Sequence, residues 1–189
     1  MKSFRMKKLW KAISLSLCGI LTAGIIAGCG SENTVDKTTL KFGVTNFADT
    51  LEPTQNYFGW VVMRYAIGEC LAKFDEKMNV QPWLAESWSI SDDHLTWTFK
   101  IRDNVKFSNG NLVTAEAVKK SIERAFTKNT RAKTFFEYTE MKADGQNLII
   151  TTSKPQPNMP GFLADPLFII VDVSAEEQGR DFSKEGPIC

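Results

Sequence analysis

The chain has 189 residues, of which 43% are hydrophobic and 11% aromatic, enough for a packed core in about one domain. Its 23 basic and 22 acidic residues nearly cancel, so no basic surface for nucleic acid is expected. With one histidine, His94, and four cysteines, the chain is too poor in ligands for a zinc cluster, and we expect neither a metal site nor a cofactor.

The N-terminus has the pattern of an export signal. Residues 1–11 carry five basic and no acidic side chains, and residues 12–27 carry no charge at all. A positive region followed by a short apolar region is typical of a secretory signal peptide. The apolar stretch is shorter than the ~20 residues that a membrane-spanning helix needs. We therefore predict that residues 1–28 are a signal peptide.

The apolar region ends at Ile26-Ala27-Gly28-Cys29, which resembles the lipobox of bacterial lipoproteins. This resemblance implies a lipid on Cys29, with residues 29–38 as a polar tether to the outer face of the cytoplasmic membrane, in the periplasmic space if the cell is Gram-negative. Multiple acyl chains anchor a protein stably. The alternative is an ordinary signal peptide with a chance cysteine. Removal of residues 1–28 takes away 5 of the 23 basic residues and no acidic residue, so 18 basic and 22 acidic residues remain.

The first elements expected after the tether are a strand, a loop and a helix. Residues 39–44 alternate between polar and apolar, which predicts a strand, and residues 46–55 contain loop-forming residues. Residues 57–74 show apolar positions at a period near 3.6, which predicts a helix.

Two hairpins are expected further along. Residues 86–91 and 95–101 flank a turn at Asp92-Asp93-His94, and strict alternation over the second run indicates a half-buried strand. Residues 138–142 and 147–152 form the second hairpin around Asp144-Gly145. Between the hairpins we expect a short strand at 105–107 with an Asn109-Gly110 turn, and a helix over 115–127 capped by Thr114. Residues 163–173 form a largely apolar run, which predicts either a buried strand or a strand after a helical turn. This mixture indicates an α/β or α+β domain.

No catalytic constellation is visible. The Gly-x-Ser-x-Gly elbow, the Walker-type phosphate loop and the Gly-x-Gly-x-x-Gly fingerprint are all absent from the sequence. His94 lies in a predicted turn, and the acidic pairs Asp92/Asp93 and Glu176/Glu177 lie in polar stretches that indicate solvated surface. We interpret Cys70 and Cys189 as free thiols, although they could pair. The sequence therefore favours a protein that is not an enzyme.

Four blocks, in this order and spacing, carry a specific resemblance. They are Pro82–Trp88 (PWLAESW), Leu95–Arg102 (LTWTFKIR), Val105–Gly110 (VKFSNG) and Thr114–Val118 (TAEAV). Together they resemble the peptide/nickel-type substrate-binding proteins of ABC importers, the family 5 solute-binding proteins. The resemblance covers essentially all of residues 40–189.

The resemblance implies a type II periplasmic-binding-protein fold of mixed α/β class, with residues 39–189 as an incomplete N-terminal first lobe. It implies a small peptide or a nickel chelate as ligand and ABC permease subunits as partners. Family members are more than twice this length, so we expect a fragment of a two-lobed receptor. The alternatives are a non-functional truncated product and, with less support, a lipid-anchored hydrolase.

In this family the ligand lies in a cleft between two lobes, and the segment 46–69 supplies the best candidates from the first lobe. They are Tyr57, Trp60, Arg64, Tyr65 and Glu69, which bring aromatic faces, a cation and a carboxylate together. An arginine can clamp a ligand carboxylate bidentately, and aromatic walls suit a largely apolar pocket. The alternative is an amphipathic helix whose aromatic side chains pack inward.

Other residues are weaker candidates. Phe168 and Asp172 lie in the apolar run on the hinge side, whereas Trp88, Trp97 and Phe99 belong to the hairpin scaffold and are expected in the core. The stretch 60–71 and the run into Phe168 look closer to the nickel branch than to dipeptide receptors. The ligand therefore stays open between a peptide and a nickel chelate.

Overall fold

The computed structural model describes residue 43 and residues 48–189 of the chain. The predicted signal peptide, the lipid site Cys29, the tether and most of the predicted strand over 39–44 lie outside the described residues. Residues 48–189 belong to one compact unit, and the description that follows concerns this unit alone. None of its helices is both long and apolar enough to cross a membrane.

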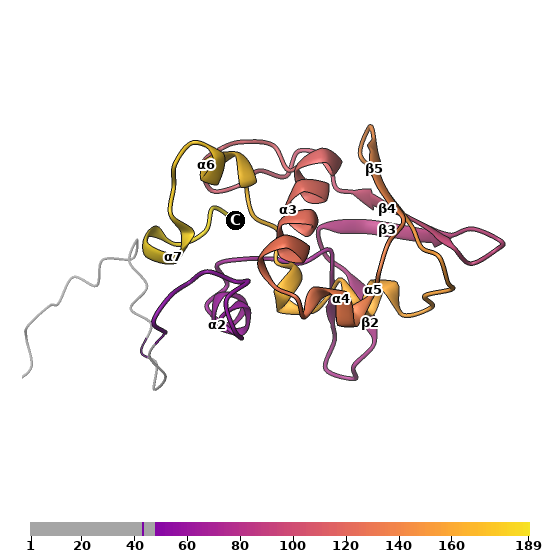
Figure 1. Ribbon diagram of the computed structural model, residues 1–189, viewed down its shortest axis with the longest axis horizontal. Helices are drawn as coiled ribbons and strands as arrows, with labels where there is room; N and C mark the ends of the chain where they lie inside the picture. Colours follow the sequence, from indigo (N-terminus) through magenta and orange to yellow (C-terminus); the bar gives the residue numbers. More distant parts are fainter. Residues whose placement is uncertain (1–42, 44–47) are drawn as a thin grey trace, which may run out of the picture. The chain divides into compact units, whose positions relative to one another are not determined.

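A four-stranded antiparallel sheet lies on one side of the unit, with the helix labelled α3 (Ala115–Lys128) beside it (Figure 1). Its strands are β3 (Ala85–Ile90), β4 (Thr96–Ile101), β5 (Glu140–Asp144) and β6 (Asn147–Thr151), in the order β3-β4-β6-β5. Both predicted hairpins are confirmed. Buried and half-buried residues alternate along β4, as the sequence pattern predicted, because only one face of the strand meets the core.

The long helix α3 (Ala115–Lys128) packs against β5 and β6. It buries an apolar stripe that includes Val118, Ile122 and Ala125, which confirms the predicted helix within one residue. The Thr114 hydroxyl accepts a hydrogen bond from the Ala117 amide at 3.1 Å, so the predicted N-cap is confirmed. The residue that ends the helix is Asn129.

We expect Thr114→Ala to lower the free energy of unfolding by about 1 kcal/mol, because the Ala117 amide loses its acceptor at the helix start. Thr127→Ala is the matched control, since the Thr127 hydroxyl is exposed and bonds only the Glu123 carbonyl of its own helix. Urea titration of both variants, followed by circular dichroism, measures the difference. An equal loss in the two variants would rule out a capping role.

Smaller elements surround this core. They are α2 (Gly59–Arg64), the two-stranded hairpin of β1 (Ala72–Phe74) and β2 (Val80–Pro82), α4 (Ala132–Phe135), α5 (Met159–Phe162), the 3₁₀ helix η1 (Pro166–Phe168), α6 (Val173–Glu177) and α7 (Phe182–Glu185). Helix α2 contacts η1, and α5 contacts β1. These contacts bring segments about one hundred residues apart in the sequence side by side.

Two of the predicted elements, the helix over 57–74 and the strand over 105–107, are wrong. The helix expected over 57–74 ends at Arg64, because Ala66 adopts a left-handed conformation with φ of 54°, and β1 begins at Ala72. Residues 105–107 do not form a strand, and only an isolated bridge joins Lys106 to Leu112. Gly110 does adopt the positive φ of the predicted turn.

The apolar run over 163–173 is buried as expected, but it is not a strand. Its backbone passes through η1 and then bonds to several different segments. The Ile170 amide donates to the Glu69 carbonyl at 2.9 Å, and the Val171 amide donates to the Ser121 hydroxyl at 2.9 Å. The side chains of the run are apolar because they are buried on several sides. Its backbone groups find hydrogen-bond partners in several different segments, so no neighbouring strand is needed.

The hairpin aromatics belong to the core, as expected. Phe99 is fully buried, Trp97 is 7% exposed, and Trp88 is half-buried and packs against them. The ring of Phe99 lies 6.0 Å from that of Trp97 and 6.2 Å from that of Trp88. Trp88 and Phe99 face each other across β3 and β4, so the three rings brace one face of the sheet.

A buried ion cluster corrects the interpretation of Glu176 as solvated surface. Glu176 is half-buried and accepts hydrogen bonds from Arg124, whereas its neighbour Glu177 is exposed. On its other side Arg124 pairs with Glu52, and both of these side chains are buried. The guanidinium also lies 5.0 Å from the ring centre of Phe182. The cluster ties segment 50–54, α3, α6 and α7 together.

Candidate functional site

An apolar hollow of about 550 Å³, which we call the first groove, lies between α2, the β1–β2 hairpin and the segment from α5 to η1. Most of its lining is carbon surface. The residues used in the argument below are Trp60, Phe74, Met78, Trp83, Phe135 and Asp165. A concave apolar site with few polar groups is the usual form of a small-molecule site.

The first groove is lined by apolar side chains that the fold leaves exposed. Trp60 is 45% exposed, Phe74 is 42% exposed and Met78 is 70% exposed. Trp60 points outward because α2 buries Gly59 and Val62 on its inner face. Exposed apolar surface that gathers around one hollow indicates a binding surface, whereas scattered exposed residues would need no explanation.

A cation stands at the edge of this groove. The guanidinium carbon of Arg131 lies 4.9 Å from the ring centre of Tyr57 and 5.4 Å from that of Phe135. Its Nη2 lies 3.5 Å from the Asp165 carboxylate. Arg131 Nε is buried and has no hydrogen-bond acceptor among the described residues. A buried N–H without an acceptor is costly, and a ligand or an ordered water could satisfy it.

Asp165 is held in place by the local sequence Asp165-Pro166. Its side chain accepts a hydrogen bond from the Leu167 amide at 2.9 Å and so caps η1. Its carbonyl accepts a hydrogen bond from the Cys70 thiol at 3.4 Å, and burial raises the pKa of that thiol. The Asp165 carboxylate meets the guanidinium through one contact of 3.5 Å, and it leaves Arg131 Nε without an acceptor among the described residues. The arrangement therefore suits an anionic or carboxylate-bearing ligand beside aromatic faces.

The five predicted ligand residues divide into two sets. The Tyr57 ring lies against Arg131, and Trp60 lines the first groove together with Asp165. Arg64 is exposed at the C-terminal end of α2, and Tyr65 is half-buried. Glu69 lines a separate hollow of about 160 Å³. The structure thus places Trp60 in the first groove, Tyr57 against Arg131, and Glu69 in a different hollow.

Arg131 and Asp165 were missed by sequence reasoning. Arg131 follows the end of a charged amphipathic helix, and a basic residue at such a position is typical of solvent-exposed surface. The available signal was the aspartate before proline, which is typical of a fixed turn or helix start. Nothing local indicates that these two side chains meet across 34 residues.

The two weaker candidates have structural partners. Phe168 is 1% exposed and packs among the rings of Phe126, Phe135 and Phe136. Asp172 accepts hydrogen bonds from the side-chain amides of Asn109 at 2.8 Å and Asn111 at 2.7 Å. Burial alone would raise the pKa of Asp172, but bonds from Ser174 and the two asparagines hold it below its ordinary value.

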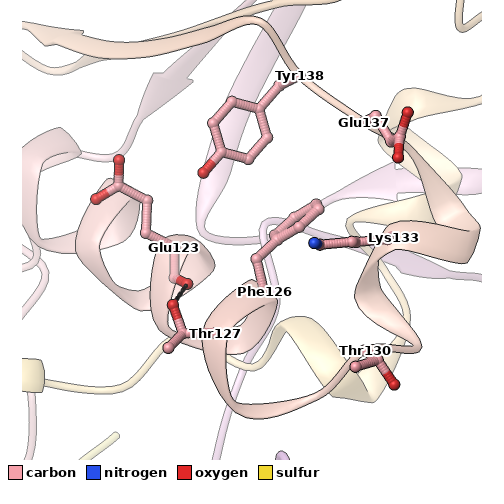
Figure 2. A pocket seen from close by; sticks show the side chains of 7 residues that line it. All are labelled: Glu123, Phe126, Thr127, Thr130, Lys133, Glu137 and Tyr138. Atoms are coloured by element: carbon pink, nitrogen blue, oxygen red, sulfur yellow. Dashed lines mark hydrogen bonds between the residues drawn. The ribbon is translucent and has the colours of Figure 1, made fainter.

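A second, more polar hollow of about 780 Å³ lies at the end of α3 and beside α4 (Figure 2). Phe126 and Tyr138 meet edge to face there, with ring centres 5.1 Å apart, and charged groups of both signs surround them. None of the predicted ligand residues lines it. Among the described residues, no group of three or more His, Cys, Asp or Glu side chains could hold a metal.

Comparison with known proteins gives a family match and several relatives. The family model described as "Bacterial extracellular solute-binding proteins, family 5 Middle" matches residues 79–189, which is more than half of the chain. The nickel-binding protein NikA of Staphylococcus aureus is 29% identical over 152 residues, which cover 80% of this chain and 30% of that protein. The glutathione-binding protein GsiB of Escherichia coli K12 is 31% identical over 112 residues, which cover 57% of this chain and 22% of that protein.

Solved structures give the same relationship. A nickel ABC transporter protein from Bacillus halodurans superposes with a TM-score of 0.65 at 38% sequence identity, over 71% of this chain and 27% of that one. The type II binding-protein architecture expected from the sequence is therefore confirmed. The chain spans less than a third of the length of these relatives.

Proposed function

Because the chain belongs to the family 5 bacterial extracellular solute-binding proteins, we propose that it forms part of an ABC importer's binding protein. In this proposal the protein captures a small ligand outside the cytoplasmic membrane and delivers it to permease subunits. The relatives named above are a nickel-binding protein, a glutathione-binding protein and a nickel ABC transporter protein, which supports a role without catalysis. A hydrolase has no support from any of these relatives.

The observation that carries the proposal is the group of Tyr57, Arg131, Phe135 and Asp165 at the edge of the first groove. Aromatic faces fix the guanidinium plane, and a fixed guanidinium recognises a carboxylate with little loss of side-chain entropy. Nickel chelates and peptides both present carboxylates. NikA and GsiB are named for nickel and glutathione, which supports keeping both ligand classes in the proposal.

The proposal includes the membrane anchor. A lipid on Cys29 would hold the capture module beside its permease, at the outer face of the membrane. Support comes from the charge pattern of residues 1–28 and from the Ile26-Ala27-Gly28-Cys29 sequence. Tyr57, Trp60, Arg64, Tyr65 and Glu69 remain proposed ligand residues, and we add Arg131 to them.

We expect Arg131→Ala to weaken binding of a carboxylate ligand by about 10- to 100-fold, because a charge-assisted hydrogen bond is worth roughly 1.5–3 kcal/mol. Isothermal titration calorimetry of the chain with the nickel–histidine complex and with glutathione measures this. Arg131→Lys should recover only part of the affinity, since it keeps the charge and loses the planar fork. Lys142→Ala is the control, because Lys142 is exposed on β5.

Two results would contradict the proposal. One is the absence of binding by either probe. The other is binding that Arg131→Ala leaves unchanged, which would place the ligand elsewhere. The comparison with Arg64→Ala decides between the two arginines, since Arg64 was the sequence-based candidate for the same clamp.

A further inference from the structure

The loop between β4 and α3 contains the one Asn-Gly step of the sequence, Asn109-Gly110. In such a step the glycine nitrogen can attack the side-chain amide carbon of the asparagine, because glycine has no Cβ to hinder the approach and its backbone is permissive. Both residues are exposed, so water reaches them. A Cβ atom built on Gly110 would meet no atom within 4 Å, so the space around this residue is open.

The folded loop holds both reacting groups in hydrogen bonds. The Gly110 amide donates to the Phe107 carbonyl at 2.9 Å. The side chain of Asn109 accepts a hydrogen bond from the Asn111 amide at 3.1 Å and donates one to the Asp172 carboxylate at 2.8 Å. Attack removes the N–H proton of Gly110 and the NH₂ group of Asn109, which are two of the donors in these bonds. The loop therefore protects Asn109 only while it stays closed against Asp172.

The carboxylate at the other end of this contact is buried and charged. Asp172 is 4% exposed, and it accepts a second hydrogen bond, at 2.7 Å, from the side-chain amide of Asn111. Burial alone would raise its pKa, but the hydrogen bonds that it accepts hold the pKa below the ordinary value, so the group is ionised at neutral pH. A second carboxylate in place of either asparagine amide would meet it at hydrogen-bond distance, where like charges repel.

We propose that Asn109 is a site of spontaneous deamidation, and that the product opens the loop that Asn109 closes. The Gly110 nitrogen forms a bond to the side-chain carbon of Asn109, and ammonia leaves with the proton of that nitrogen. Water then opens the cyclic imide and gives aspartate or isoaspartate. One water molecule is consumed and one ammonia molecule is released, so the reaction needs no co-reactant besides water.

Neither product restores the closed loop. Aspartate replaces a donor to Asp172 by a second negative charge, and isoaspartate also lengthens the backbone at the turn where Gly110 has a φ of 91°. Phe107 and Val113, which flank the turn, are each 4% exposed and belong to the core. An open loop therefore loosens the core beside α3, and the hydrolysis makes this change one-way.

The rate of the reaction is measured by incubating the folded chain and the guanidinium-unfolded chain at mildly alkaline pH. Trypsin releases both asparagines in the peptide 107–119, and mass spectrometry follows deamidation at each of them. We expect Asn109 to react in the unfolded chain and to react at least about tenfold more slowly in the folded chain, because the loop must open first. Asn111 is the internal control. It makes the same contact with Asp172, but Leu112 follows it, so it should stay intact in both.

Three variants test what the product does to the fold. Asn109→Asp carries the charge of the product, whereas Asn109→Ala removes the hydrogen bond without adding a charge. Asn109→Asp should lower the urea midpoint of unfolding by at least about twice as much as Asn109→Ala. Asn111→Asp is the matched variant and should lower it by a similar amount, because it places a carboxylate against the same Asp172 oxygen.

Three results would overturn the inference. Equal rates in the folded and unfolded chains would show that the loop does not protect Asn109. An unfolded chain that keeps Asn109 intact would remove the modification site itself. Equal midpoints for Asn109→Asp and Asn109→Ala would show that the charge of the product does not open the loop. The rates come from the unchanged chain, so they decide the first two points whether or not the variants fold.

Discussion

Replacing Arg124 with methionine is expected to lower the free energy of unfolding by about 3–5 kcal/mol, because it leaves a buried carboxylate without its cation. Arg124 is 7% exposed and Glu52 is 5% exposed. Two hydrogen bonds of 3.0 and 2.6 Å join their side chains. On its other edge the guanidinium donates to Glu176 at 2.6 and 3.1 Å. Urea unfolding at pH 7, followed by circular dichroism, measures the loss.

Two further variants test whether the loss comes from the buried charge. Glu52→Leu combined with Arg124→Met buries no unpaired charge at this point and should recover part of the stability. Lys128→Ala removes only the exposed partner of Glu176, 3.0 Å away, and should cost less than about 1 kcal/mol. If Arg124→Met costs no more than Lys128→Ala, the cluster does not hold the segments together.

The difference in unfolding free energy between the wild type and Arg124→Met should depend on pH with a definite sign. Burial alone would raise the pKa of Glu52, but hydrogen bonds from Arg124 and Thr54 outweigh it and hold the pKa below its ordinary value of 4.5. A carboxylate with a lowered pKa in the folded state stabilises the fold above its unfolded pKa, and this is lost as pH falls through the folded value. The gap between the wild type and Arg124→Met should therefore be widest near pH 7 and narrow below about pH 4.

The parts of the fold that the sequence predicted correctly are those set by local pattern. The alternation in β4, the turn residues of both hairpins and the Thr114 cap each act within a few residues. The prediction of a helix over 57–74 was wrong because Ala66 takes a left-handed conformation that alanine rarely adopts. No residue type in the segment therefore indicated where α2 ends. The buried positions of the segment beyond Arg64 arise from packing against the apolar run over 163–173.

The candidate site shows the same limit. The sequence grouped Tyr57 and Trp60 as candidates on one segment, but it could not show that Arg131 lies over the Tyr57 ring or that Asp165 lines the same hollow as Trp60. These contacts join positions far apart in the chain, and only the packing of α2 on η1 brings them together. Glu69 shared the predicted helix with Trp60, but that helix ends at Arg64, and Glu69 lines a different hollow from Trp60.

The contact between α2 and η1 depends on a glycine. A Cβ atom built on Gly59 would lie closer than van der Waals contact to the Pro166 carbonyl group and 3.0 Å from the Pro53 carbonyl oxygen. All of these neighbours are backbone atoms, which cannot rotate away as a side chain can. The same approach positions Trp60 beside Pro166 and Asp165 at the wall of the first groove.

We therefore expect Gly59→Ala to lower the free energy of unfolding by about 2–3 kcal/mol, because forcing α2 off η1 costs more than the roughly 0.5–1 kcal/mol that alanine gains in a helix. Gly161→Ala is the matched control, since it lies in the short helix α5 and its Cβ would meet side chains at an ordinary 3.7 Å. Both variants gain the higher helix propensity of alanine. The difference between their urea midpoints therefore measures the cost of the contact between the added methyl group and the backbone of Pro166 and Pro53.

Gly59→Ala should also weaken ligand binding, because it displaces Trp60 from the wall of the first groove that Asp165 also lines. A variant that keeps full stability and full affinity would show that α2 can shift on η1 without cost, and that the first groove does not depend on this contact.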